Sequence, residues 1–533
     1  MRRNADLLRG GTFDLLVVGG GIYGAWTAYD AALRGLRVAL VERGDFASET
    51  SSASSKLIHG GLRYLEYREF GLVRKTLDER NRLRQLGPHR VRRMRFAIPL
   101  HNSSWWFRTK LRLGLTLYDL MARRNRPLRG HENLSARRLA QRYDFLNPNQ
   151  LDAGFTYGDC QTDDARFVIE ILSGATAAGA VVLNYTPALR LLKEDDTIVG
   201  AVVDDLISGG TIPVKARRVA LCAGAWNQGL LDANGPQKKV RTRFSKGTHI
   251  ILPRLPTEDA FLLLTGERGR IVFMIPWNGR TLVGTTDTSY DGDLDAARCE
   301  AEDERYLLRH VNAALRPNAR WSSDDIISRF AGLRTFPATD GDSSSLSREW
   351  EAVDAAPGVI ASVGGKYTSA RADAAKLVNK VATELNHEKL ASPTTWRELP
   401  WRPEGRYRGW QQRSLTRALQ CGLDEETAAG CQLRYGEQVE ALCELVERLP
   451  ELSQRYVQDA PYCVGELVFV SQREAVHHLE DVLRRRLPLL LVSRLSRERV
   501  AFAAAIVGKV LGWSDSRRDQ ELRLLCSDWK IEA

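Results

Sequence analysis

Three glycines and one acid carry the first chemical signal in this sequence, because their spacing suits a dinucleotide phosphate. Gly19 and Gly21 follow a short apolar run, and Gly24 lies three residues further on, where an alanine-rich helix begins. In such a turn the first glycine permits the bend, the second admits the pyrophosphate and the third lets helix and strand pack closely. A second apolar run ends at Glu42, eighteen residues after Gly24, where a carboxylate can accept both ribose hydroxyls. The pattern predicts a dinucleotide site on a strand, helix and strand unit.

The polar segment at 50–64 indicates which dinucleotide this site would bind. It combines several serines and one threonine with two glycines. Hydroxyl and N–H groups of this kind can bind a second phosphate and reach the edge of an isoalloxazine ring. Leu57, Ile58 and Leu62 add apolar bulk that a solvated linker would not need. The segment therefore favours a flavin over a nicotinamide.

The run SSASSKLIHGGLRYLE at 51–66 resembles the signature of the FAD-dependent glycerol-3-phosphate dehydrogenases. These respiratory flavoenzymes oxidise sn-glycerol 3-phosphate to dihydroxyacetone phosphate, with hydride passing from C2 to N5 of FAD. The resemblance is close over 12–390 and looser over 400–515, and it implies FAD as cofactor and a quinone as electron acceptor. One departure, the Thr-Phe-Pro run after Arg334, leaves a related polyol phosphate open as the substrate.

The predicted cofactor contacts come from the glycine turn, the polar segment, two later glycine turns and the resemblance. In the later turns, Ala223-Gly224 and Gly365-Lys366, a glycine after a strand lets backbone N–H groups approach the flavin. The full set of predicted FAD contacts is Gly19, Gly21, Ile22, Gly24, Glu42, Arg43, Thr50, Ser51, Ser52, Ser54, Ser55, Lys56, Leu57, His59, Gly60, Gly61, Ala223, Gly224, Gly365, Lys366, Tyr367 and Thr368.

A phosphorylated substrate needs fixed cations, and three candidates stand close to glycines. Arg63, Arg334 and Lys366 each follow a glycine within three residues, so the backbone can pack tightly while the side chain projects. Guanidinium groups suit phosphate because their two N–H bonds match two of its oxygens. The resemblance places these three cations around substrate and flavin and adds Tyr64 and Thr286 to the predicted substrate contacts.

The sequence leaves three possibilities for the group that accepts the proton of the substrate's C2 hydroxyl. His59 adjoins the ring-binding segment and His249 lies on an expected strand, and either imidazole can accept a proton near neutral pH. An alkoxide stabilised by Arg334, with no dedicated base, is the third possibility. The predicted catalytic residues are thus Arg334, His59 and His249.

The order of motifs predicts an α/β fold made of two interleaved modules and an appended one. A Rossmann-like FAD-binding domain is interrupted twice by a cap, which the strand patterns after 246 predict to be an antiparallel sheet, and a nearly all-helical domain follows a proline-rich boundary. The expected ranges are 12–90, 151–245 and 340–390 for the FAD-binding domain, 91–150 and 246–339 for the substrate-binding cap, and 400–533 for the helical domain.

Composition indicates the kind of partner and the cellular compartment to expect for the protein. The formal net charge of +11 favours an anionic partner. The eight cysteines contain no C-x-x-C pair, which suits a reduced compartment, and the adjacent His477 and His478 would point about 100° apart on a helix, so no metal site is expected. No signal peptide and no apolar run of about 20 residues is found, so the protein is expected in the cytoplasm, associated with the inner face of the cytoplasmic membrane.

Residues 105–121 allow two interpretations. As a helix they carry one narrow polar stripe on an otherwise mostly apolar surface, and Arg123, Arg124 and Arg126 follow. Such a helix could lie on a membrane surface, where quinone would reach the flavin. The slightly favoured interpretation is a helix packed between the cap and the FAD-binding domain.

Two other functions compete with the dehydrogenase interpretation. A glycerol-3-phosphate oxidase would pass the electrons to oxygen, but the inserted block typical of those enzymes is not evident in the cap. A flavin-fold protein that binds RNA would need a basic stripe with aromatic residues, and the arginine-rich run at 82–95 lies among family-like residues instead. We therefore expect no nucleic-acid partner, and a homodimer is possible.

Overall fold

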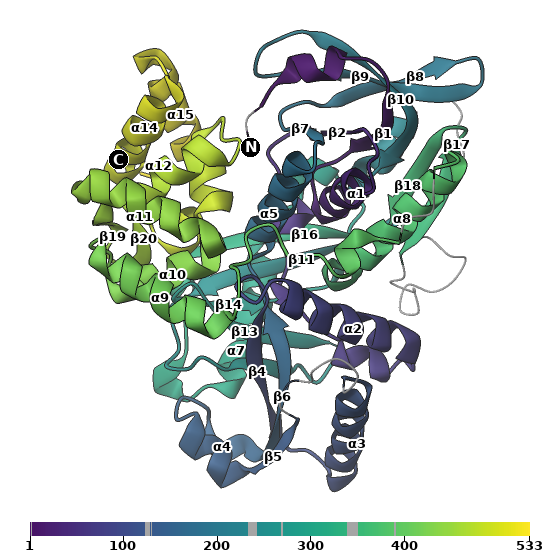
Figure 1. Cartoon of the computed structure of the whole chain (residues 1–533). Helices are drawn as coiled ribbons and strands as arrows, with labels where there is room; N and C mark the ends of the chain where they lie inside the picture. The colour runs from purple at the N-terminus through teal and green to yellow at the C-terminus, as the bar shows by residue number, and fades with distance from the viewer. Residues whose placement is uncertain are drawn as a thin grey trace.

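Two β-sheets and a group of C-terminal helices make up the protein (Figure 1). The first sheet lies at the upper right of Figure 1, the second extends from the middle to the lower edge, and the C-terminal helices lie on the left. This arrangement confirms the predicted α/β class with an interleaved antiparallel sheet and a C-terminal helical domain. The computed structural model describes residues 1, 3–122, 128, 130–232, 242–267, 270–337, 350–387 and 391–532.

The first sheet is mainly parallel and runs in the order β17-β18-β10-β1-β2-β7, with the β8–β9 hairpin joined to β10. Its strands are β1 (Phe13–Val18), β2 (Val38–Val41), β7 (Val181–Leu183), β8 (Ala188–Glu194), β9 (Thr197–Asp204), β10 (Thr211–Leu221), β17 (Glu351–Ala356) and β18 (Val359–Val363). Leu15 and Val17 face a cluster formed with α1 (Ile22–Leu33), α5 (Asp164–Ala177) and α8 (Ala370–Glu384).

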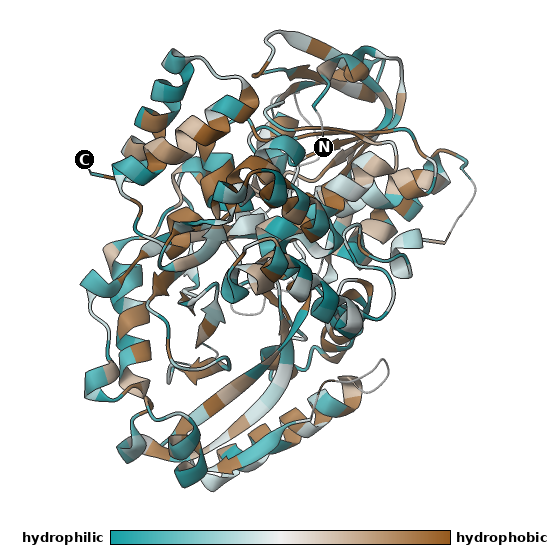
Figure 2. Ribbon diagram, turned by 60° about the vertical axis from the view of Figure 1, so that its left-hand side comes forward, coloured by the Kyte–Doolittle hydropathy of each residue, from teal (hydrophilic) through white to brown (hydrophobic). Residues whose placement is uncertain are grey.

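Both faces of this sheet are covered, which explains why its strands are continuously apolar. Leu16 and Val18 of β1 pack into a second cluster with the β8–β9 hairpin, on the face opposite to Leu15 and Val17. In Figure 2 the strands beside the N-terminal label are accordingly mostly brown.

The second sheet is mostly antiparallel and follows the order β15-β11-β14-β13-β12-β4-β6-β3, with β16 paired to β11 and β5 to β6. Its strands are β3 (Leu57–Ile58), β4 (Arg92–His101), β5 (Glu132–Ser135), β6 (Leu151–Gln161), β11 (Thr242–Leu252), β12 (Ala260–Leu264), β13 (Ile271–Trp277), β14 (Arg280–Gly284), β15 (Thr288–Ser289) and β16 (Ser328–Pro337). Because β6 belongs to it, this sheet continues past the 91–150 segment expected for the cap. The domain boundaries therefore stay a prediction.

Four helices accompany the second sheet, and a short one follows β10. They are α2 (Phe70–Leu86), α3 (Trp105–Ala122), α4 (Ala136–Arg142), α7 (Ala301–Ala314) and α6 (Asn227–Asp232). The helix α3 lies at the lower edge of Figure 1, next to α2.

The C-terminal region is helical apart from one small hairpin. Its elements are α9 (Tyr407–Gln420), α10 (Glu425–Tyr435), α11 (Val439–Arg448), β19 (Arg455–Val457), β20 (Ala460–Cys463), α12 (Val464–Arg473), α13 (Leu489–Val492), α14 (Arg497–Leu511) and α15 (Asp515–Asp528). A π-helical turn at Asp481–Arg486 precedes α13.

Buried ion pairs join the C-terminal region to the first sheet. Asp45, in the loop after β2, contacts both Arg485 and Arg486. Burial raises the pKa of the Asp45 carboxyl, but the two guanidinium groups outweigh it and lower that pKa to about 2. A buried charge that lost such partners would be strongly destabilising, so the C-terminal region helps to hold the loop after β2 in place.

Candidate functional site

A cavity of about 350 Å³ opens at the carboxyl ends of β1 and β2 and is lined by Gly19, Gly21 and Glu42. Gly19 has a φ of +114°, and a Cβ added to it would stand 2.6 Å from the carbonyl oxygen of Cys222. A Cβ on Gly24 would stand only 1.9 Å from the carbonyl oxygen of Gly19. The turn therefore requires glycine at both positions, which leaves the N-terminus of α1 open to an anionic group.

Glu42 lies at the end of β2 and lines the same cavity. Its carboxylate accepts the backbone N–H of Gly20 at 2.6 Å and that of Gly44 at 2.9 Å. Burial raises the pKa of this carboxyl, while the two N–H bonds favour its charged form. Each carboxylate oxygen retains a lone pair, so Glu42 can still accept ribose hydroxyls.

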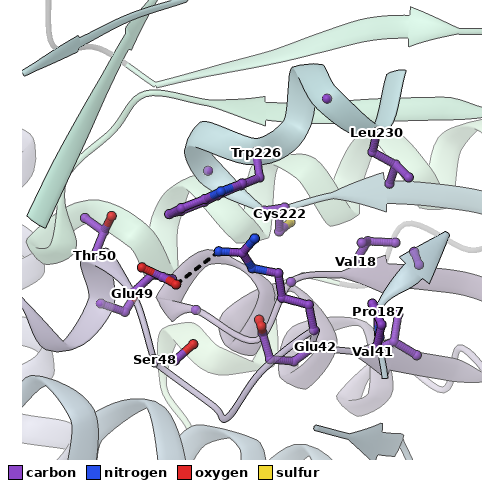
Figure 3. A pocket seen from close by; sticks show the side chains of 18 of the residues that line it. Val18, Val41, Glu42, Ser48, Glu49, Thr50, Pro187, Cys222, Trp226 and Leu230 are labelled. Carbon is purple, nitrogen blue, oxygen red and sulfur yellow. Dashed lines mark hydrogen bonds and ion pairs between the residues drawn. The ribbon is translucent and has the colours of Figure 1, made fainter. Parts of the chain in front are cut away.

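Arg43 links the edge of this cavity to the part of the chain that carries the second sheet. Its Nη2 lies 2.6 Å from Asp295 Oδ1 and 3.1 Å from Glu49 Oε1, and its guanidinium carbon lies 4.4 Å from the centre of the Trp226 ring. Trp226 Nε1 donates to the same Asp295 oxygen at 3.0 Å. Asp295 comes from the short turn Leu294–Ala296, before α7. Figure 3 shows Trp226 and Glu49 beside the cavity, with the Arg43–Glu49 ion pair as its dashed line.

A second cavity of about 300 Å³ continues from the first and shares Gly21, Thr50, Ser51 and Gly224 with it. Ser51 Oγ accepts the backbone N–H of Ile22 at 2.9 Å, so this hydroxyl stands at the N-terminus of α1. Together the cavities offer an acid for a ribose, a glycine turn with a helix N-terminus for a pyrophosphate and a further polar pocket beyond it. These residues fit a dinucleotide as long as FAD.

The far end of the second cavity is built by a glycine turn between β18 and α8. Gly364 and Gly365 have φ values of +68° and +99°, and a Cβ on Gly365 would stand 1.8 Å from Tyr23 Oη. The backbone N–H of Lys366 donates to the same hydroxyl at 2.9 Å. His59, on the opposing segment, donates its backbone N–H to Thr368 Oγ1 at 3.1 Å. The turn thus holds the loop of His59 beside the backbone that would face a flavin ring.

A third cavity of about 170 Å³ adjoins this end and shares Ser55, His59, Tyr64 and Arg334 with the second. Arg63 and Arg270 also line it, and the Lys366 ammonium lies 3.3 Å from the centre of the Tyr64 ring. The side chains of three arginines and one lysine therefore stand in or next to the third cavity. An anionic substrate group fits such surroundings.

Arg334 is held by the strand pairing of β16 with β11, which sets Ser245 opposite it. Its guanidinium donates to Thr285 Oγ1 at 2.7 Å and to Ser245 Oγ and Asp287 Oδ1 at 3.1 Å each. A Cβ on Gly247 would stand 2.0 Å from Arg334 Nη2, so glycine makes the room for this side chain. The guanidinium is thereby fixed in direction toward the cavity that it lines.

His249 of β11 lines the second cavity and is buried. Its Nε2 lies 2.9 Å from Ser55 Oγ, and its ring stacks on Phe330 with 5.0 Å between centres. Burial, reinforced by the charges of Arg334 and Lys56, lowers the pKa of this imidazole well below its usual value. The ring is therefore neutral at physiological pH, and its Nδ1 has no hydrogen-bond partner within the described ranges.

Most of the residues predicted from the sequence lie around these three joined cavities. Those among their lining residues are Gly19, Gly21, Ile22, Glu42, Arg43, Thr50, Ser51, Ser54, Ser55, Leu57, His59, Gly61, Arg63, Tyr64, Ala223, Gly224, His249, Arg334, Gly365, Lys366, Tyr367 and Thr368. Those outside the lining sets are Gly24, Ser52, Lys56, Gly60 and Thr286.

The structure gives two of the outlying residues other partners. The Lys56 ammonium forms a buried ion pair with Asp164 at 2.6 Å. Thr286 Oγ1 accepts the backbone N–H of Thr248 at 3.0 Å, and it is the neighbouring Thr285 whose side chain contacts Arg334.

Sequence reasoning missed Thr285, Arg270, Tyr23 and Trp226. Thr285 was within reach, since it precedes the predicted Thr286 on the same strand end. Arg270 opens an apolar strand pattern and Tyr23 sits inside the glycine turn, so each had a local signal. Nothing in the sequence indicates that Trp226 meets Arg43, because these residues come together only in the folded chain.

Within the described ranges, no group of three or more histidine, cysteine, aspartate or glutamate side chains is placed to hold a metal ion. The same ranges contain no helix long and apolar enough to cross a bilayer.

Two family models cover most of the chain. The model described as FAD dependent oxidoreductase matches residues 14–380. The model described as the C-terminal domain of alpha-glycerophosphate oxidase matches residues 402–518. The first spans the three joined cavities, and the second spans the C-terminal helices that anchor Asp45.

Known proteins resemble the chain over nearly its whole length. Glycerol-3-phosphate dehydrogenase 2 of Mycobacterium tuberculosis is 34% identical over 516 residues, which cover 96% of this chain and 87% of the relative. The glycerol-3-phosphate dehydrogenase of Synechocystis is 32% identical, covering 98% and 97%. The crystal structure of the Bacillus halodurans enzyme, solved with FAD, superimposes with a TM-score of 0.80 at 27% identity, covering 98% and 97%. The cofactor of this protein is FAD, and the chain belongs to the family of FAD-dependent glycerol-3-phosphate dehydrogenases.

Proposed function

We propose that this protein oxidises sn-glycerol 3-phosphate to dihydroxyacetone phosphate and delivers the electrons to a membrane quinone. The cationic third cavity is the observation that carries the substrate assignment. Arg63, Arg270 and Arg334 line it, and it adjoins the pocket that suits the flavin ring. A phosphomonoester of a small polyol matches both the charge and the volume of about 170 Å³.

In the proposed complex the phosphate is bound by the guanidinium groups, with Arg334 held in direction by Asp287 and Thr285. FAD, when bound, supplies the two-electron acceptor for the hydride that leaves C2 of the substrate. The same oxidation releases one proton from the C2 hydroxyl, so the site needs a group that accepts it.

We assign the proton acceptor to His249. The imidazole starts neutral, and its Nε2 lies 2.9 Å from Ser55 Oγ, which lines both the second and the third cavity. In the tautomer with the proton on Nδ1, Nε2 can accept the substrate hydroxyl proton through the Ser55 hydroxyl. Arg334 and Lys56 make the protonated ring unfavourable, so the proton has to leave again through Ser55 or solvent. His59 lines both the ring and the substrate cavity and is the competing candidate.

The quinone acceptor, a peripheral contact with the inner face of the cytoplasmic membrane and a homodimer complete the proposal. An apolar acceptor resides in the bilayer, so the enzyme has to meet a membrane surface to use it. The second family model is named after an oxidase, which favours oxygen, whereas the relatives of 32–34% identity are named dehydrogenases. Reoxidation of the reduced protein distinguishes the two acceptors.

An anaerobic absorbance titration tests the substrate. Adding sn-glycerol 3-phosphate to the FAD-loaded protein should bleach the oxidised-flavin band near about 450 nm in proportion to the substrate added. Glycerol without phosphate should bleach it far less at the same concentration. A flavin that stays oxidised would contradict the substrate assignment.

Reoxidation of the reduced protein then tests the acceptor. A soluble quinone should restore the band much faster than dissolved oxygen. Equal or faster reoxidation by oxygen, with stoichiometric hydrogen peroxide, would make the protein an oxidase.

A further inference from the structure

The helix α3 exposes a run of large apolar side chains. Trp105 and Trp106 are 72% and 67% exposed, and Leu113, Leu117 and Leu120 are 66%, 37% and 52% exposed. Of the seventeen large apolar side chains exposed in the described part of the chain, these five lie on one helix of 18 residues. We call them the α3 stripe. A concentration of this kind marks an interaction surface.

The α3 stripe lies on the side of the helix that the fold does not use. Four of its members, all except Trp105, fall within about 60° around the axis at 3.6 residues per turn. Leu115, Tyr118 and Ala122 lie on the opposite side and are buried against the second sheet and α2. The helix therefore has two apolar sides, of which only one is packed, and Figure 1 shows it at the margin of the molecule.

Charge indicates which partner covers the stripe. Lys110 and Arg112 are exposed beside it, and neither forms an ion pair with any residue that the structure describes. Arg123, Arg124 and Arg126, which the sequence places after the helix, lie outside the described residues. Adjacent tryptophans, leucines and free cations on one short helix match the composition of a helix lying in the headgroup layer of an anionic membrane.

The packed side of α3 is hydrogen-bonded to the loop that carries the active-site residues. Tyr118 Oη accepts the backbone N–H of Gly60 at 3.0 Å and donates to Asp159 Oδ2 at 2.7 Å. Asp159 is fixed in turn by Arg80 at 2.9 Å. A Cβ on Gly60 would stand 2.4 Å from Tyr118 Oη, so the approach is as close as a glycine permits. Gly60 directly follows His59.

We propose that the α3 stripe docks on an anionic lipid surface and that Tyr118 transmits docking to the substrate loop through Gly60. The inference rests on the membrane contact in the proposed function and assigns it to one helix. Docking restrains α3, and the Tyr118–Gly60 hydrogen bond then restrains the loop that bears His59, Arg63 and Tyr64. Substrate binding is therefore expected to tighten on a membrane.

Co-sedimentation of the full-length FAD-loaded protein with vesicles tests the docking. The vesicles contain phosphatidylcholine with or without phosphatidylglycerol. The variant Trp106→Ser/Leu113→Ser/Leu117→Ser should lose at least tenfold in partitioning, while its FAD content and its activity with a soluble acceptor stay unchanged. The matched control Leu419→Ser/Leu449→Ser/Leu524→Ser removes apolar residues of similar exposure from the C-terminal region and should bind as the unmodified protein does.

The co-sedimentation result tests the membrane contact and its assignment to α3 separately. If the unmodified protein binds and the α3 variant binds equally well, the membrane contact stands and its assignment to α3 is wrong. If the unmodified protein does not bind either vesicle, both the membrane contact and the docking helix are wrong. Lys110→Gln/Arg112→Gln should lower binding about tenfold on the anionic vesicles and leave binding to phosphatidylcholine alone unchanged.

The coupling has its own test. With a soluble acceptor, anionic vesicles should lower the KM of the unmodified protein for glycerol 3-phosphate several-fold. Tyr118→Phe keeps the ring but loses both hydrogen bonds, so it should sediment with the vesicles normally and show no change in KM on binding. A KM of the unmodified protein that vesicles leave unaltered would overturn the coupling and leave the docking intact.

Discussion

Arg43 and Asp295 meet 2.6 Å apart at the edge of the first cavity, which Glu42 lines, although they come from the regions of two different sheets. Arg43 follows Glu42, the acid that we propose binds the ribose, at the end of a strand of the first sheet, and Asp295 precedes α7 beside the second sheet. Trp226 is hydrogen-bonded to Asp295 and stacked under Arg43, so one contact orders an aromatic ring as well. This contact holds the turn before α7 against the edge of the first cavity, where we propose that the adenosine of FAD binds.

Breaking this contact should speed the release of FAD. The side chains of Arg43 and Asp295 are 40% and 59% exposed, so solvent screens the attraction between their charges. We therefore expect the loss of this ion pair to cost at most about 1 kcal/mol of FAD-binding free energy. We expect Asp295→Asn to raise the dissociation rate of FAD about two- to fivefold, measured by recovery of flavin fluorescence after dilution. The neighbouring Asp291→Asn should leave the rate unchanged. Equal rates in both variants would show that the contact does not retain the cofactor.

Replacing Glu42 should weaken FAD binding more strongly. Glu42→Ala removes the acceptor of two backbone N–H bonds and of the ribose hydroxyls, and charged hydrogen bonds contribute about 1.5–3 kcal/mol each. The dissociation constant of FAD should rise at least about tenfold. Glu42→Gln keeps one acceptor oxygen, so its dissociation constant for FAD should lie between those of the unmodified protein and Glu42→Ala. Full occupancy of Glu42→Ala after dilution would refute the ribose assignment.

Arg334 should affect the substrate and leave the cofactor in place. Removing a guanidinium that binds phosphate costs about 2–3 kcal/mol, so Arg334→Ala should raise the KM for glycerol 3-phosphate about 30- to 160-fold. FAD content should stay normal. Arg329 lies on the same strand but pairs with Glu304 at 2.7 Å, so Arg329→Ala is the matched control. Unaltered steady-state kinetics of Arg334→Ala would place the phosphate elsewhere.

The acidity of His249 predicts the pH profile. Because the pKa of the imidazole lies well below its usual value, the ring is neutral above that pKa and able to accept a proton. Falling pH protonates it, so kcat/KM should stay constant at neutral pH and decline only well below pH 6.5. His249→Asn should lose most of its activity together with this acid limb. A limb that persists in His249→Asn and disappears in His59→Asn would make His59 the base.

Much of the first sheet was predictable because each element has a local signal. The apolar run before Gly19 became β1, and the alanine-rich helix expected from Gly24 became α1, which starts two residues earlier at Ile22. Leu15 and Val17 pack on one face of the sheet, and Leu16 and Val18 pack on the other. A strand that is covered on both faces is apolar throughout, so a continuous apolar run was enough to predict it. The strands expected before the Ala223-Gly224 and Gly365-Lys366 turns are β10 and β18.

The candidate site was predicted less evenly, and the reasons are physical. Residues on a glycine turn, such as Gly21 and Gly365, line the cavities because backbone conformation alone puts them there. Lys56 does not line the cavities because its ammonium pairs in the interior with Asp164, which is more than a hundred residues away in the sequence. The contact of Arg43 with Asp295 likewise depends on how the two regions pack. Short-range patterns carry no information about such partners.

The order of strands in the first sheet also determines when this protein can begin to fold. β1 needs β10 as its parallel neighbour, and β10 needs β18, which ends at residue 363. A chain leaving the ribosome therefore carries β1 with an unpaired edge until β10 is complete at residue 221. It carries β10 with an unpaired edge until β18 is complete at residue 363, when more than two-thirds of the chain has been synthesised. Contacts so distant in sequence raise the contact order and slow folding, and they leave apolar edges exposed meanwhile. The yield of active enzyme in a cell should therefore depend on chaperones that shield the nascent chain.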